Sequence, residues 1–119
     1  MKRTIAFTLT AIAIMAAAAL AAQPWQPPNG TYELVGVFEP PNQGPFYMVV
    51  KIEDGVLTII EPEHDPETLD WHGPMQFFSG AGGGGGSITL QFYDNATFGY
   101  HDTATGAIAR GTVTYVFGQ

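Results

Sequence analysis

The chain contains no cysteine among its 119 residues. A disulfide framework is therefore excluded, which argues against the usual small eukaryotic secreted module and favours a bacterial exported protein. The stretch LAAQ at 20–23 stands where a bacterial lipoprotein would carry its lipidated cysteine. Lipid anchoring through that position is excluded as well.

Positive charge is also scarce. Four Lys and Arg residues face eleven Asp and Glu residues, so the formal net charge is −7. Two of the four cations, Lys2 and Arg3, lie in the N-terminal segment, and without these two charges the net charge becomes −9. Only Lys51 and Arg110 then remain. Nucleic acids and anionic lipid surfaces are poor partners for such a chain, because phosphate groups are bound by clustered Lys and Arg.

A long apolar run occurs only near the N-terminus. The basic pair Lys2-Arg3 precedes an alanine-rich run at 5–20, and 19–21 has the small-x-small pattern of a cleavage site. This order predicts a signal peptide at 1–21, cleaved after Ala21 or Ala22, and export to the bacterial periplasm or the extracellular space. The alanine-rich run is weakly hydrophobic, so we expect no stable membrane anchor after cleavage, although an uncleaved anchor is the alternative.

The rest of the chain shows almost no helical periodicity. A proline-rich arm at 22–30, expected to be flexible or to lie along a sheet edge, precedes a single β domain at 31–119. Apolar residues alternate with period two in seven short segments separated by turn residues. The pattern predicts an all-β fold, a small antiparallel barrel or sandwich of about seven strands with one short helix. The predicted strands are 32–38, 46–53, 56–61, 74–80, 87–94, 96–102 and 107–117.

Three glycine-containing stretches predict local features of this fold. Asp54-Gly55 joins two alternating runs and is typical of a two-residue type I′ hairpin turn. The phase of alternation changes around Arg110-Gly111, which predicts a β-bulge there. The glycine-rich stretch at 79–87 predicts a long mobile connection between strands, with a flap over the mouth of a barrel as the alternative.

Residues 61–72, EPEHDPETLDWH, concentrate carboxylates and histidines. The short helix is predicted from four residues in this region: Asp65 as N-cap, Pro66 in the first turn, acidic Glu67 and Gly73 as a stop signal. The alternative is a metal site. Its spacing matches neither a zinc nor a calcium motif, so we expect no cofactor and no metal. If a metal does bind, the candidate ligands are His64, Asp65, Asp70 and His72.

A hydrolytic set can also be drawn from His101-Asp102 with Ser79 or Ser87, but such a set is defined by geometry that the sequence does not give. The leading interpretation is a non-enzymatic binding or interaction module for a small apolar ligand, a glycan or a protein partner. The alternative is a metal-dependent or acid/base hydrolase that uses 61–72. A hollow barrel would favour ligand binding and a solid core a surface interaction. The candidate ligand-binding residues are the aromatic Tyr32, Trp71, Phe98 and Tyr100.

Overall fold

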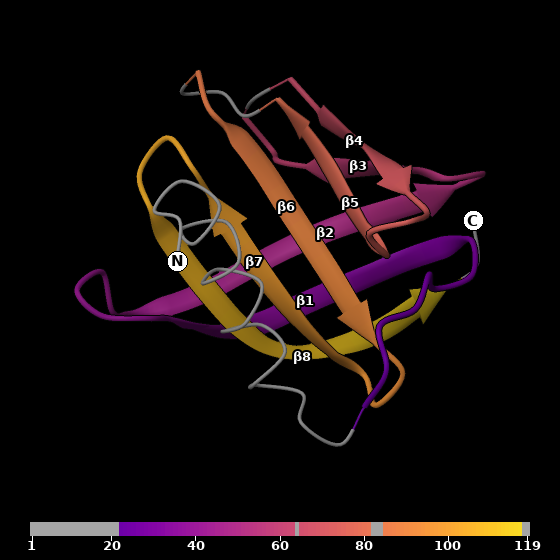
Figure 1. The fold of residues 1–119 in the computed structure, drawn as a ribbon, viewed down its shortest axis with the longest axis horizontal. Helices are drawn as coiled ribbons and strands as arrows, with labels where there is room; N and C mark the ends of the chain where they lie inside the picture. Colours follow the sequence, from indigo (N-terminus) through magenta and orange to yellow (C-terminus); the bar gives the residue numbers. More distant parts are fainter. Residues whose placement is uncertain (1–21, 64, 82–84, 118–119) are drawn as a thin grey trace.

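The computed structural model describes residues 22–63, 65–81 and 85–117, and leaves the predicted signal peptide, His64 and part of the glycine run outside the described residues. The described part of the chain folds into a closed barrel of antiparallel strands (Figure 1). Each strand pairs with its neighbours in sequence, and β1 pairs with β8 to close the barrel. The strands are β1 (Gly30–Phe38), β2 (Pro45–Glu53), β3 (Val56–Ile60), β4 (Glu67–His72), β5 (Phe77–Ala81), β6 (Ser87–Tyr93), β7 (Thr97–Asp102) and β8 (Ala107–Phe117).

The all-β barrel confirms the predicted fold class, but the short helix was wrong. The described residues contain no helix, and the stretch expected to form one is strand β4. Leu69 is fully buried while Thr68 and Asp70 are exposed, which is the period of a strand. Asp65 and Pro66 do carry helix-start signals, but pairing with both β3 and β5 satisfies the backbone of β4 and buries Leu69. Tertiary pairing therefore outweighs the local signals, and the strand count rises from seven to eight.

The turn between β2 and β3 has the predicted form. Asp54 and Gly55 have φ angles of 52° and 83°, and Glu53 pairs with Val56 across them. Positive φ at both central residues is the requirement of a type I′ turn, so the Asp-Gly prediction is confirmed.

Inward-facing side chains from all eight strands form one large buried cluster. Phe46, near the start of β2, has its ring centroid 5.3 Å from that of Phe98 and 4.8 Å from that of Tyr100. In β5, Phe78 is fully buried and Phe77 is half-buried, so Phe78 supplies the inward-facing side chain. These side chains form the core of the barrel. Its buried members are Tyr32, Leu34, Phe46, Val50, Ile52, Leu57, Ile59, Leu69, Phe78, Ile88, Leu90, Phe92, Phe98, Tyr100 and Ala109.

The barrel closes where two glycines face each other on β1 and β8. Gly36 pairs with Gly111, and a Cβ on Gly111 would lie 2.0 Å from the carbonyl oxygen of Val35. A side chain at this point would overlap the neighbouring backbone. The bulge predicted at Arg110-Gly111 was wrong: register is continuous there, and the irregularity lies between Thr31 and Tyr32, opposite the end of β8.

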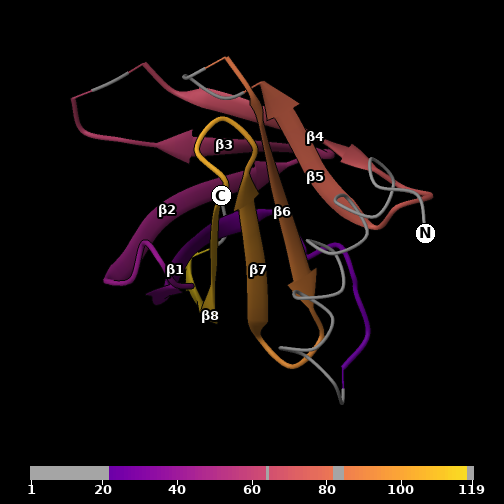
Figure 2. The same cartoon turned by 60° about the vertical axis from the view of Figure 1, so that its left-hand side comes forward.

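Alternation of strand direction gives the barrel two distinct ends (Figure 2). The start of β1 and the turns after β2, β4 and β6 lie at one end, which we call the arm end, because the chain enters β1 there from the proline-rich arm, residues 22–29. The other connections, including the glycine-rich one between β5 and β6, lie at the opposite end, the loop end. Ser79, Gly80 and Ala81 of the stretch predicted as a connection belong to β5, which pairs antiparallel with β6.

Candidate functional site

The arm lies along the end of β6 and the turn that follows it. The amide of Trp25 donates to the carbonyl oxygen of Phe92 at 3.0 Å, and the amide of Asp94 donates to the carbonyl oxygen of Gln23 at 3.0 Å. The Gln23 amide in turn donates to Oδ1 of Asp94 at 3.1 Å. Because proline lacks an N–H, the arm does not continue as a ninth strand, and its pairing amounts to a single bridge between Pro24 and Tyr93.

A second set of contacts fixes the arm where it enters β1. The Tyr32 hydroxyl donates to the carbonyl oxygen of Pro28 at 2.6 Å. Burial, with a smaller contribution from Tyr115, raises the pKa of Tyr32, so this hydroxyl keeps its proton at neutral pH. The Asn29 side chain accepts from the Asp54 amide at 3.0 Å. The arm therefore crosses one end of the barrel. Hydrogen bonds fix it near Gln23 and Trp25 at its start and near Pro28 and Asn29 where it enters β1.

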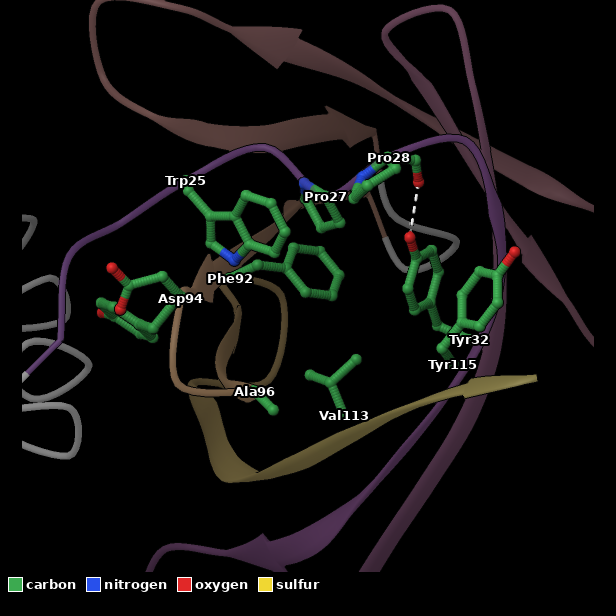
Figure 3. Close-up of a pocket in the computed structure, with 10 residues that line it drawn as sticks. Trp25, Pro27, Pro28, Tyr32, Phe92, Asp94, Ala96, Val113 and Tyr115 are labelled. Carbon is green, nitrogen blue, oxygen red and sulfur yellow. Dashed lines mark hydrogen bonds between the residues drawn. The ribbon is translucent and has the colours of Figure 1, made fainter. Parts of the chain in front are cut away.

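A pocket of about 430 Å³ lies between the arm and the mouth of the barrel (Figure 3). This volume falls within the range usual for small-molecule sites, about 300 to 1,000 Å³. The lining is mostly apolar and rich in aromatic rings and proline. It consists of Trp25, Pro27, Pro28, Tyr32, Phe92, Tyr93, Asp94, Ala96, Val113 and Tyr115.

Two of the five aromatic side chains of the pocket are exposed to solvent, and the other three are buried. Trp25 is 39% exposed and Tyr115 is 55% exposed. Tyr115 meets Tyr32 edge to face, with ring centroids 5.4 Å apart. Figure 3 shows Trp25 and Asp94 toward one end of the pocket and the two tyrosines toward the other, with Phe92 between them. Such a site can enclose an apolar body between ring faces and leave a polar group near Asp94.

The other predicted ligand-binding residues do not line this pocket. Phe98 and Tyr100 lie in the core, although Phe98 also borders a second hollow of about 300 Å³ near Arg110 and Thr112. Trp71 is half-buried and packs against Phe78, with ring centroids 5.0 Å apart. Of the aromatic set expected from the sequence, the structure places Tyr32 at the pocket.

Trp25, Phe92, Val113 and Tyr115 line the pocket but were not predicted as site residues. The sequence does contain a pattern that points to two of them. Phe92 and Tyr115 lie in the inward phase at strand ends that a meander brings to the same end as the start of β1, where the arm enters. The missing information was the strand order.

The carboxylate and histidine stretch is spread out in the structure. Asp65 lies exposed before β4, and Asp70 and His72 are exposed two positions apart on the strand, while His64 falls outside the described residues. Residues two apart on a strand share a face, so Asp70 and His72 lie on the same side of β4. Among the described residues, no group of three or more His, Asp or Glu is close enough to hold a metal ion.

The residues of the hydrolytic alternative are arranged on β5 to β7. His101 and Asp102 are adjacent on β7 and so point to opposite sides of the sheet, which prevents them from orienting each other beside one serine. Burial lowers the pKa of His101, and the nearby Asp102 charge opposes that effect. Ser87 Oγ lies 3.5 Å from Thr103 Oγ1. Ser79 pairs with Thr89 on β6.

Carboxylates around Tyr100 make the loop end electrostatically negative. Burial, followed by the charges of Asp102, Glu67 and Glu61, raises the pKa of Tyr100 to about 12. Each of these causes disfavours the tyrosinate form. The aromatic pocket and this acidic region therefore occupy opposite ends of the barrel.

The fold and the pocket together define a small, closed, up-and-down β-barrel with a core of buried apolar side chains and an aromatic pocket at one end. Comparisons with protein-family models, curated proteins and solved structures find no match for this chain. Within the described ranges, no helix is long and apolar enough to span a membrane.

Proposed function

We propose that this chain is a non-enzymatic binding protein that holds a small apolar ligand in the arm-end pocket. The observation that carries the proposal is a mostly apolar pocket of about 430 Å³ at the mouth of the barrel, in which Trp25 and Tyr115 are exposed. The ligand would lie under the arm, at the mouth of the barrel, because the core side chains below it are buried. Covering the two exposed rings with an apolar ligand would contribute about 25 cal/mol for each Å² removed from water.

The chemistry of the lining supports binding rather than acid/base catalysis. Asp94 is the one residue of the described lining that is charged at neutral pH. Acid/base chemistry usually requires two groups with different proton affinities that both face the substrate. Tyr32 and Tyr93 do not fill the second role, since burial raises the pKa of Tyr32 and raises that of Tyr93 to about 12.

The place of action is also part of the proposal. The predicted signal peptide would deliver the β domain to the periplasm or the extracellular space, where the pocket would meet its ligand. The absence of cysteine fits a barrel that depends on its packed core for stability rather than on disulfides.

The test uses the neutral fluorophore N-phenyl-1-naphthylamine, whose emission rises in apolar sites. A variant with Trp71→Phe leaves Trp25, in the arm, as the remaining tryptophan, so ligand binding at the pocket should change its emission. We expect saturable binding, several-fold weaker in Tyr115→Ala. Tyr47→Ala is the matched control, because Tyr47 is 62% exposed on β2 and does not line the pocket. Non-saturable emission, or equal loss in the two alanine variants, would contradict the proposal.

A further inference from the structure

The charge distribution around the pocket disfavours an anionic ligand. The two cations of the described chain are engaged elsewhere: Lys51 Nζ lies 3.7 Å from Glu53 Oε1, and Arg110 Nε lies 2.7 Å from Glu39 Oε2. Neither lines the pocket, whereas the exposed Asp94 does. A carboxylate, sulfonate or phosphate on the ligand would therefore meet a negative charge and no fixed positive one.

The polar side chains of the pocket likewise favour a positively charged ligand over an anionic one. The Tyr32 hydroxyl already donates to Pro28, so it is engaged within the wall. The Asp94 carboxylate accepts one bond from the Gln23 amide, and an ionised carboxylate has room for about four. Trp25 at the same end carries a neutral indole N–H donor, so the negative charge and the further acceptor positions at this end come from the Asp94 carboxylate.

The aromatic rings add attraction for a cation. A ring face attracts an ammonium group within about 6 Å of its centroid, and tryptophan does so best. Trp25 lies at the same end of the pocket as Asp94 in Figure 3, and its ring is partly exposed. Phe92 and Val113 provide an apolar floor beside that end.

We propose that the arm-end pocket binds hydrophobic organic cations. The ammonium group lies between the Trp25 ring and the Asp94 carboxylate, and the apolar body packs on Phe92, Val113 and Tyr115. This inference rests on the proposed binding function and narrows its ligand to one chemical class.

The experiment compares three naphthalene ligands of similar size by isothermal titration calorimetry: (1-naphthylmethyl)trimethylammonium, 1-naphthalenemethanol and 1-naphthylacetate. We expect the cation to bind about tenfold tighter than the alcohol, in keeping with one cation–π contact and one exposed ion pair. The anion should bind more weakly than the alcohol. Higher salt should weaken binding of the cation and leave that of the alcohol unchanged.

Asp94→Asn supplies the site-specific test. Asparagine retains the oxygen that accepts from the Gln23 amide, so the arm keeps its contact while the charge is lost. Affinity for the cation should fall about fivefold and affinity for the alcohol should stay the same. Asp70→Asn is the matched control, because it removes an equal charge from the exposed face of β4, and it should change neither affinity by more than about twofold.

The outcomes separate this inference from the function on which it rests. Equal binding of the cation and the alcohol, or a cation affinity unchanged by Asp94→Asn, would overturn the proposed ligand class and leave a general apolar site. Failure of all three ligands and of the neutral fluorophore to bind would overturn the binding function itself.

Discussion

The glycine pair at the closure of the barrel predicts a large effect from a single methyl group. In Gly111→Ala the new Cβ would lie 2.0 Å from the Val35 carbonyl oxygen and 2.5 Å from the Gly36 Cα. Both contacts are with backbone of the paired strand, so no side-chain rotation can relieve them. Strands β1 and β8 must separate locally by about 1 Å, because an unstrained carbon–oxygen contact is near 3.3 Å. Tilting of the two strands can absorb the remaining part of the overlap.

The cost follows from the hydrogen bonds at that point. Separation disturbs the pairing of Val35 with Thr112, of Gly36 with Gly111 and of Val37 with Arg110. Two or three weakened backbone bonds, at about 0.5 to 1.5 kcal/mol each, give a loss of about 1 to 4.5 kcal/mol in the free energy of unfolding. For a domain of this size the melting temperature should fall by at least about 4 °C.

The assay is a thermal melt followed by circular dichroism, with Gly73→Ala as the control. A Cβ on Gly73 would meet only the Trp71 Nε1 atom, at 3.6 Å, which is an ordinary contact. That variant should melt within about 3 °C of the parent or slightly above it, because alanine restricts the unfolded chain. If Gly111→Ala melts like Gly73→Ala, the close approach of β1 and β8 at this position is refuted.

Two further predictions test β4 and the loop end. Leu69→Ala should lower the free energy of unfolding by about 2 to 5 kcal/mol, because Leu69 is fully buried. Thr68→Ala, at an exposed position of the same strand, should cost less than about 1 kcal/mol. Equal effects of the two substitutions in urea unfolding would contradict the assignment of β4 as a strand. The folded-state pKa of Tyr100 lies near 12, above its ordinary value of 10.0, so the unfolded chain releases this proton first as pH rises. The contribution of protonated Tyr100 to the free energy of unfolding should therefore be fully present below about pH 10. It should be lost between about pH 10 and 12. Tyr100→Phe should reduce this decline in urea unfolding measured across that range, and an undiminished decline would show that Tyr100 is not responsible.

The period-two alternation of apolar residues was enough to predict most of the barrel. Strands such as β2 and β3 combine a clear alternation with an Asp-Gly turn whose backbone requirement is local. β4 was missed because Asp65 and Pro66 give a local helix signal, while the competing signal comes from pairing with the neighbouring strands β3 and β5, which the stretch 65–73 does not itself contain. In β5 two adjacent phenylalanines, Phe77 and Phe78, leave the phase ambiguous until the neighbouring strands are placed.

The pocket was less accessible to prediction than the fold. Its walls come from the arm, the start of β1 and the ends of β6 and β8, so it exists only once the chain order of the barrel is known. Tyr32 was identified through its inward phase, but the role of Trp25 depends on a path of the arm that proline-rich sequence does not specify. Proline limits pairing without choosing a direction.

The meander order of the strands also bears on how the barrel forms. Seven of the eight strand pairings join consecutive strands, whereas the β1–β8 pairing brings together Gly36 and Gly111, which are 75 positions apart (111 minus 36). Hairpins form within about 1 to 10 μs, but closing a long loop first carries an entropy penalty that grows with its length. We therefore expect the hairpins to assemble first and the β1–β8 closure to complete folding. Until then β1 and β8 are open sheet edges, and self-association of incompletely folded chains should begin along these two strands.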